Sequence, residues 1–176
     1  MRTLIAGVLL LGSVGLLSAR GDDDDWKEFK PKNGKFTVKM PGKPKDISRD
    51  IDVGGDKVKA NIHAVEVGPT GAYLVSWTDF PEGLIDQDNI ATHLDGVQNG
   101  VVTSGKGKVL SQKTVKVQKK YVGRDVNYTV PNINGTGRVR IFFVGDRLYQ
   151  IMALGDKTFM DSDDIDTFFD SFALTK

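Results

Sequence analysis

The chain contains no cysteine. This absence excludes disulfide bonds, thiol catalysis, zinc sites with thiolate ligands, iron–sulfur clusters and a lipid anchor attached to a cysteine. A chain without disulfide bonds has to be stabilised by burial of its core. The length permits this, because a domain of about 150 residues buries roughly 68–70% of the surface of its unfolded chain.

The chain also lacks an excess of charge of either sign. Its 24 basic and 23 acidic residues give a formal net charge of +1. Removal of residues 1–21 would take away Arg2 and Arg20 and no acid, which leaves a net charge of −1. Proteins that bind nucleic acid gain affinity from a basic surface that displaces counterions. The overall balance therefore argues against a nucleic-acid partner.

Long apolar runs are missing apart from one short run near the N-terminus. Leu4 to Leu17 is uncharged over 14 residues, which suits the hydrophobic region of a signal peptide at ~7–15 and falls short of the ~20 that span a bilayer. Small residues follow this run at Ser18, Ala19 and Gly21. Residues 1–21 are therefore interpreted as a signal peptide cleaved after Gly21, which implies a periplasmic or extracellular location. Cleavage after Ala19 and an uncleaved N-terminal anchor are the alternatives.

The remaining chain is predicted to contain a charged spacer at residues 22–34 and a single domain at residues 35–174. The spacer begins with four aspartates, and consecutive like charges favour a solvated segment. The domain begins with residues 35–40, where apolar and polar side chains alternate as in a half-buried strand.

Several later segments also read as strands. Residues 57–67 alternate until Val65 and Val67, where the phase changes, and we attribute this change to a β-bulge. Residues 72–80, 139–144 and 147–154 carry apolar side chains on both faces. Such strands are typical of the centre of a sheet that is covered on both sides.

Two segments have the period of a helix. Residues 86–102 place apolar side chains at helical spacing, and residues 161–172 place Phe168, Phe169 and Phe172 on one stripe. We expect these three rings to anchor the last helix against the sheet near Tyr149 and Ile151. The alternative is an exposed aromatic stripe that docks to a partner or a membrane.

These elements predict an α+β domain with a twisted, mainly antiparallel sheet of six to eight strands and two principal helices packed on it. A lipocalin-like barrel is the competing fold, but a helix between two groups of strands fits it poorly.

Candidate catalytic histidines are scarce, since His63 and His93 are the only two. A Ser–His–Asp site needs a histidine beside an activated serine. No serine lies in a G-x-S-x-G motif, and Ser76, Ser104 and Ser171 have ordinary surroundings. Both histidines are therefore expected to be solvated or at the edge of the core.

Two further motifs suggest ligands but lack parts of the pattern. Residues 100–107 (GVVTSGKG) match GxxxxGK, yet Gly107 replaces the Ser or Thr that holds Mg²⁺, and the segment follows a helix. The acidic cluster Asp161, Asp163, Asp164 and Asp166 lacks the glycine and distant glutamate of a calcium loop. We interpret the first as a helix end and the second as acids that favour a helix N-terminus.

The residues also resemble a known fold. Phe36-Thr-Val-Lys-Met-Pro41-Gly42, the strand Arg147–Ile151 and the ending Phe168–Phe172 are similar to the PsbP-like fold, which occurs in the extrinsic photosystem II protein PsbP and in a nuclear Ran-binding protein. The resemblance covers residues 35–174 and is strongest to exported bacterial proteins of planctomycete type. It supplies no catalytic residue, and the photosynthetic and Ran-binding roles do not transfer, because no partner-contact motif matches.

The sequence therefore predicts an exported, non-catalytic binding or accessory module of the cell envelope, without a cofactor or a bound metal. Its expected partner is an envelope protein or a small ligand. The alternative is a hydrolase or metal-dependent enzyme built around His63 or the Asp161–Asp166 cluster.

Overall fold

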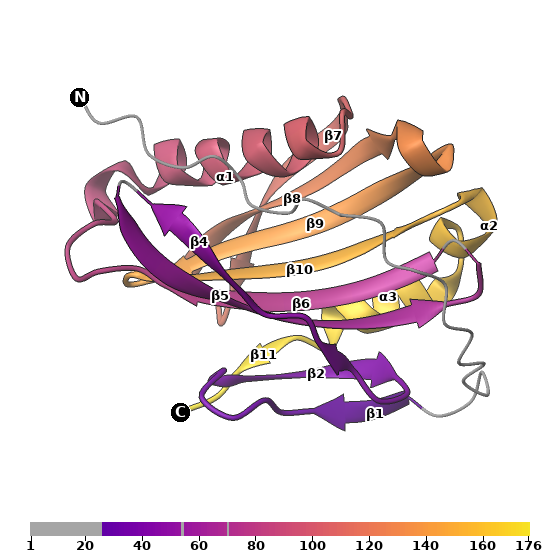
Figure 1. The fold of residues 1–176 in the computed structure, drawn as a ribbon, viewed down its shortest axis with the longest axis horizontal. Helices are drawn as coiled ribbons and strands as arrows, with labels where there is room; N and C mark the ends of the chain where they lie inside the picture. The colour runs from indigo at the N-terminus through magenta and orange to yellow at the C-terminus, as the bar shows by residue number, and fades with distance from the viewer. Residues whose placement is uncertain (1–25, 54, 70) are drawn as a thin grey trace.

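An eight-stranded antiparallel sheet forms the centre of the molecule (Figure 1). The structure, a computed structural model, describes residues 26–53, 55–69 and 71–176. The strands follow the order β3-β5-β6-β10-β9-β8-β7, and β4 also pairs with β5. They are β3 (Lys45–Asp46), β4 (Arg49–Val53), β5 (Asp56–Val67), β6 (Gly71–Asp79), β7 (Val109–Val117), β8 (Tyr121–Val130), β9 (Gly135–Val144) and β10 (Arg147–Gly155).

A smaller sheet and three helices complete the fold. The smaller sheet has the order β1-β2-β11 and is antiparallel throughout. Its strands are β1 (Trp26–Phe29), β2 (Phe36–Pro41) and β11 (Ala173–Leu174). The helices are α1 (Ile90–Ser104), α2 (Lys157–Met160) and α3 (Asp163–Asp170), and short 3-10 turns lie at Gln87–Asn89 and Pro131–Ile133.

The large sheet buries both of its faces. On one, the α1 face, the side chains of Leu74, Ile141 and Met152 share a buried cluster with Leu94 and Val97 of α1. On the opposite face, the α3 face, the small sheet and α3 provide the cover (Figure 1). The buried side chains there include Val75, Tyr149, Ile151, Phe36, Val38 and Phe168. The predicted α+β class with cover on both sides of the central strands is confirmed.

Two side chains of β10 attach the small sheet to the large one. Arg147 donates hydrogen bonds to the backbone carbonyls of Asn33 and Gly34, at 2.8 and 3.1 Å, and pairs with Asp79. The hydroxyl of Tyr149 donates to the carbonyl of Gly34 at 3.1 Å. Side chains of the large sheet therefore hold the turn before β2 by binding the backbone carbonyls of that turn.

The β-bulge predicted in β5 is absent. The pairing of β5 with β6 runs without interruption from Ala60↔Thr78 to Val67↔Gly71. Val65 and Val67 pack against the cluster on the α3 face, whereas Ile62 is buried on the α1 face. The apparent change of phase marks the point where β5 becomes covered on its second face.

The predicted spacer needs a similar correction. Trp26–Phe29, which falls within it, is strand β1 and pairs with β2. The Trp26 ring contacts Tyr73 with centroids 5.4 Å apart, and both aromatic side chains of β1 pack against the α3-face cluster. These two aromatic rings outweigh the charge of the segment, because pairing of β1 with β2 half-buries them against the core. The predicted signal peptide and Asp22–Asp25 lie outside the described residues.

The two predicted helices are present with shifted bounds. Asp86 caps the turn before α1 by accepting a hydrogen bond from the backbone N–H of Asp88 at 3.0 Å. The predicted helix at residues 161–172 is divided between α2 and α3, and Ser162 caps α3 by accepting from the N–H of Asp164. α3 ends at Asp170, so Phe172 lies beyond it.

The phenylalanines nevertheless anchor this end of the chain, as predicted. Phe168 and Phe169 are 0% and 1% exposed. Phe172 is half-buried, and its ring centroid lies 5.3 Å from that of Phe36 and 5.8 Å from that of Tyr149. The first two rings therefore belong to the core and do not form an exposed docking stripe.

We predict that Phe168→Ala lowers the free energy of unfolding by about 3–5 kcal/mol, because it leaves a cavity in a fully buried site. Phe172→Ala should cost clearly less, because that ring already contacts solvent. Urea denaturation of the two variants measures both values. Equal losses, or a Phe168→Ala protein as stable as the parent, would contradict the assignment of Phe168 to the core.

Candidate functional site

The two histidines lie on opposite faces of the large sheet. His63 in β5 stacks on Trp77, with centroids 5.5 Å apart, and meets the edge of Phe29 at 4.9 Å on the α3 face. His93 in α1 lies 6.1 Å from the ring of Phe143 on the α1 face. The sheet separates them, so they do not share a pocket.

Each histidine has a local structural role. Burial lowers the pKa of His63, and the nearby negative charge of Asp46 opposes this shift. The Nε2 atom of His93 accepts a hydrogen bond from the backbone N–H of Asp86 at 3.1 Å, which supports the start of α1. Both contacts match the prediction of histidines at the edge of the core.

The acidic cluster is distributed between helix termini and ion pairs. Asp161 pairs with Lys157 of α2, and Asp166 pairs with Arg138 at 2.7 Å. Asp163 and Asp164 lie in the first turn of α3, where the helix dipole favours acids. In the part of the chain that the structure describes, no group of three or more His, Cys, Asp or Glu could hold a metal ion.

The GxxxxGK segment ends a helix, as the sequence predicted. Gly105 follows the last residue of α1, and the backbone N–H of Gly107 donates to the carbonyl of Val102 at 2.9 Å. A phosphate loop places its N–H groups at the start of a helix, whereas this segment presents the opposite end.

Among the described helices, none is long and apolar enough to cross a membrane.

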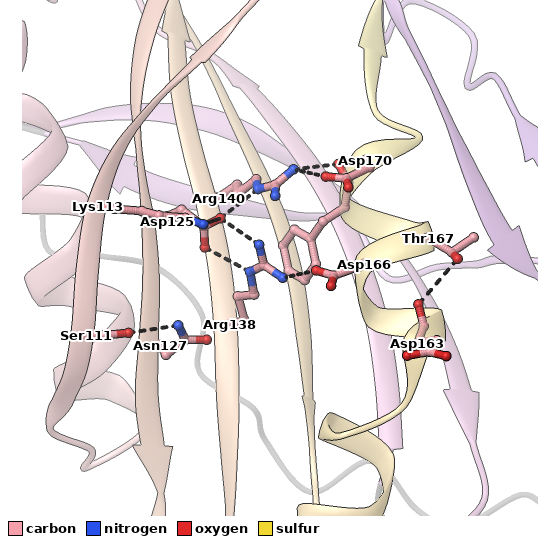
Figure 2. Close-up of polar contacts among 11 residues, drawn as sticks. Ser111, Lys113, Asp125, Asn127, Arg138, Arg140, Asp163, Asp166, Thr167 and Asp170 are labelled. Atoms are coloured by element: carbon pink, nitrogen blue, oxygen red, sulfur yellow. Dashed lines mark hydrogen bonds and ion pairs between the residues drawn. The ribbon is translucent and has the colours of Figure 1, made fainter.

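The most buried charged group of the large sheet is Asp125 in β8. Its carboxylate accepts two hydrogen bonds from Arg138, at 2.9 and 2.8 Å, and one from Arg140 at 2.8 Å (Figure 2). Lys113 of β7 approaches the same carboxylate at 3.9 Å. The register places these residues side by side, because Asp125 pairs with Lys113 on one neighbouring strand and with Arg140 on the other.

The two arginines extend from Asp125 to α3. Arg138 binds Asp166 at 2.7 Å, and Arg140 binds Asp170 and the backbone carbonyl of Phe169 at 3.0 and 2.9 Å (Figure 2). Both guanidinium groups also lie over the Phe169 ring, at 4.5 and 5.2 Å from its centroid. The network is internally neutralised and fixes α3 on the sheet, so we assign it to structure.

The charge state of Asp125 follows from these contacts. Burial raises the pKa of its carboxyl, but the hydrogen bonds and positive charges of Arg138 and Arg140 lower it further, and the net direction is downward. The two arginines therefore favour the ionised form of Asp125, and its side chain has no exposure to solvent.

A different surface lies beyond this network, at the outer edge of the large sheet. Residues 106–120, which we call the lysine edge, contain six lysines and no acidic residue. They comprise β7 and the turns on either side of it. The lysines are Lys106, Lys108, Lys113, Lys116, Lys119 and Lys120, and all six are exposed.

Most of these lysines have no acidic partner. Lys113 pairs weakly with Asp125, and Lys120 lies 4.9 Å from the centre of the Tyr121 ring. Within the described ranges, no ion pair joins the other four to an acid. The lysine edge therefore presents an uncompensated positive field to solvent.

The strand at this edge is uncovered to an unusual degree. Every residue from Val109 to Thr114 is exposed, although alternate side chains point to opposite faces of the sheet. Val109 and Leu110 are 43% and 57% exposed. The first six residues of β7 thus lie largely outside the cover of the sheet, whereas Val115 and Val117 pack against the cluster on the α3 face.

Sequence reasoning missed this surface because it considered net charge over the whole chain. The signal was present as a run of 15 residues with six lysines and no acid. Acidic residues elsewhere in the chain offset these lysines in the net charge. Only the topology shows that the run forms an edge strand.

No protein-family model matches the chain, and no curated protein matches it in sequence. A solved structure does match: the solution structure of cyanobacterial PsbP from Synechocystis, with a TM-score of 0.50 and 13% sequence identity. The match covers 93% of this chain and 98% of that protein. The chain has the PsbP-like fold that its sequence resembles, and this degree of identity shows the fold alone.

We predict that Asp125→Asn costs about 3 kcal/mol of unfolding free energy, because it removes the buried anion that Arg138 and Arg140 share. Since folding lowers the pKa of Asp125, this stabilisation is fully present above the unfolded value of about 3.9 and is lost as pH falls through the lower folded value. Denaturation of the parent and the variant between about pH 7 and pH 2 should therefore show a difference that shrinks only below about pH 4.

Asp170→Asn is the control, because that side chain is 70% exposed and should contribute less than about 1 kcal/mol. A difference between the parent and Asp125→Asn that stays constant down to about pH 2 would show that the ionisation of Asp125 does not support the fold.

Proposed function

We propose that this protein is an exported, non-catalytic accessory module of the cell envelope that binds an acidic region of another protein through the lysine edge. The observation that carries the proposal is the excess of lysine over acid in residues 106–120, on a strand whose first six residues are exposed. Complementary charge increases the rate of encounter and selects acidic partners over basic ones.

The positions of the residues considered for catalysis support the proposed binding role. His63 and His93 are separated by the sheet, and the Asp161–Asp166 carboxylates are used at helix termini and in ion pairs. A general base has to lie within hydrogen-bonding reach of a nucleophile or a substrate in one pocket. The largest described charge network is already neutralised around Asp125.

An acidic partner would supply the carboxylates that residues 106–120 lack. In the free protein the six lysines are hydrated, so their charges carry no desolvation penalty. When carboxylates approach at low ionic strength, the lysines would gain Coulomb energy. The fold shared with PsbP supports an accessory role without naming the partner. Export is supported by the short apolar run at residues 4–17 with Arg2 before it and small residues after it.

We predict that a variant carrying four substitutions, the edge variant, binds the partner more weakly. It combines Lys106→Gln, Lys108→Gln, Lys116→Gln and Lys119→Gln. Tagged protein recovered from the envelope of its host should retain the partner near 0.1 M salt and release it near 1 M, where the Debye length falls from about 10 Å to about 3 Å. The edge variant should bind about tenfold more weakly, as expected for four exposed charges.

A matched control removes the same charge elsewhere. It combines Lys30→Gln, Lys32→Gln, Lys43→Gln and Lys57→Gln, which are also exposed. Carbodiimide cross-linking of the parent should join lysines of residues 106–120 to carboxylates of the partner, because this reagent links only groups in direct contact. Equal binding by the edge variant, or cross-links only at the control lysines, would refute the proposed function.

Export has its own test. The mature protein should begin at Asp22, and it should be recovered outside the cytoplasm. Intact mass and N-terminal sequencing of protein from the host measure this directly. A soluble cytoplasmic protein that retains residues 1–19 would refute export and leave the binding surface unaffected.

A further inference from the structure

β7 offers a partner its backbone as well as its lysines. It forms hydrogen bonds with β8 on one side only and ends the strand order of the large sheet. The outer side of β7 therefore carries a row of N–H and C=O groups that no described strand pairs. Such a row is the template for strand addition by an extended peptide.

The regular part of this template is short and well defined. The pairing of β7 with β8 shifts register between Val109 and Ser111, so Leu110 is the extra residue of a bulge. From Ser111↔Asn127 to Val117↔Tyr121 the register is continuous. A partner strand therefore has about seven residues of straight edge to pair with, which is close to the usual strand length of 5–6.

The lysines flank this edge on both faces of the sheet. Lys113 pairs with Asp125, whose side chain faces the α3 side together with Arg138. Lys116 pairs with Val122, which packs against the cluster on the α1 face. Positive charge thus lies above and below the free backbone.

We propose that the partner's acidic region binds as an extended segment that adds a ninth strand to the large sheet beside β7. This inference rests on the proposed function and specifies how the lysine edge binds. Carboxylates on both faces of the added strand would meet Lys113 and Lys116, while its backbone pairs with the outer side of Ser111–Val117. The partner class is an acidic peptide segment of about seven residues with β-branched residues between its acids.

Two other occupants fit the observations less well. A second copy of this chain would place the same lysines against one another, and like charges on adjacent strands are unfavourable. A broad anionic surface would approach from one face of the sheet, whereas Lys113 and Lys116 lie on opposite faces. Only a strand in the plane of the sheet contacts both sets and the free backbone at once.

The test uses the whole exported protein and two synthetic peptides with identical side chains. The first is a capped ten-residue peptide of valine, threonine and four glutamates spread over both faces. The second carries N-methyl groups on two adjacent central residues, so that it loses a hydrogen-bond donor on each of its edges. Both peptides have the same charge, and only the first can pair fully with β7.

Strand addition predicts that the unmethylated peptide slows hydrogen exchange at alternate amides of Ser111–Val117 and that N-methylation weakens its binding about tenfold or more. NMR titration and amide exchange measure both effects. Equal affinity for the two peptides, unchanged exchange in β7, or no binding of the unmethylated peptide at about 1 mM would overturn strand addition.

The edge variant separates this result from the proposed function. If both peptides bind the parent equally and the edge variant binds neither, the lysine edge recognises acids through side chains, and only strand addition fails. If neither peptide binds but cross-links still locate the partner at residues 106–120, strand addition fails and the proposed function stands. If the partner binds the edge variant as it binds the parent, the proposed function fails.

Discussion

The large sheet is apolar on both faces, and this constraint determines where the rest of the chain must lie. β6 and β10 direct buried side chains to both sides, and no disulfide bond exists to compensate for an exposed face. Burial contributes roughly 25 cal/mol per Å² of apolar surface, so each face requires a layer. α1 covers one face from the middle of the sequence. The first and last strands of the described chain, β1 and β11, lie over the other face. Both pair with β2, which joins them into the small sheet.

The cover on the α3 face includes one polar region. Near β6 and β10 the contacts are aromatic and aliphatic, whereas β8 and β9 contribute the polar side chains of Asp125, Arg138 and Arg140 beside apolar ones such as Phe142. Two arginines can bind one buried carboxylate and still reach two acids of α3, because the guanidinium group has five donors in a plane. This network closes the core on its polar side. Beyond it β7 is covered only in part. Val115 and Val117 pack against the cluster on the α3 face, whereas Val109 to Thr114 are exposed.

The alternation of apolar residues and their helical spacing predicted most of the elements. Each pattern shows which side chains of a segment must be buried, and this depends on the segment alone. Phe36, Val38 and Met40 are buried as their spacing indicates, and Leu94 and Val97 face the core as the helical stripe requires. What could not be predicted depends on neighbours distant in sequence. Trp26 becomes part of a strand only because β2 is available, and Phe172 packs although its helix has ended. Asp125 was not identified because its partners are assembled by the register of three strands.

The lysine edge combines an unpaired backbone with local positive charge, and the net charge of the whole chain reveals neither. A long uncovered edge strand is a hazard in any soluble protein, and lysines on such an edge repel other copies of itself. The same charges do not oppose an acidic strand, so under the proposed function the feature that disfavours self-pairing would also discriminate between partners. A neutral edge would pair with any extended segment, and an edge blocked by proline would pair with none. Under the proposed function, six lysines around an unpaired backbone edge leave pairing possible and favour acidic segments, which is the property expected of a selective binding surface.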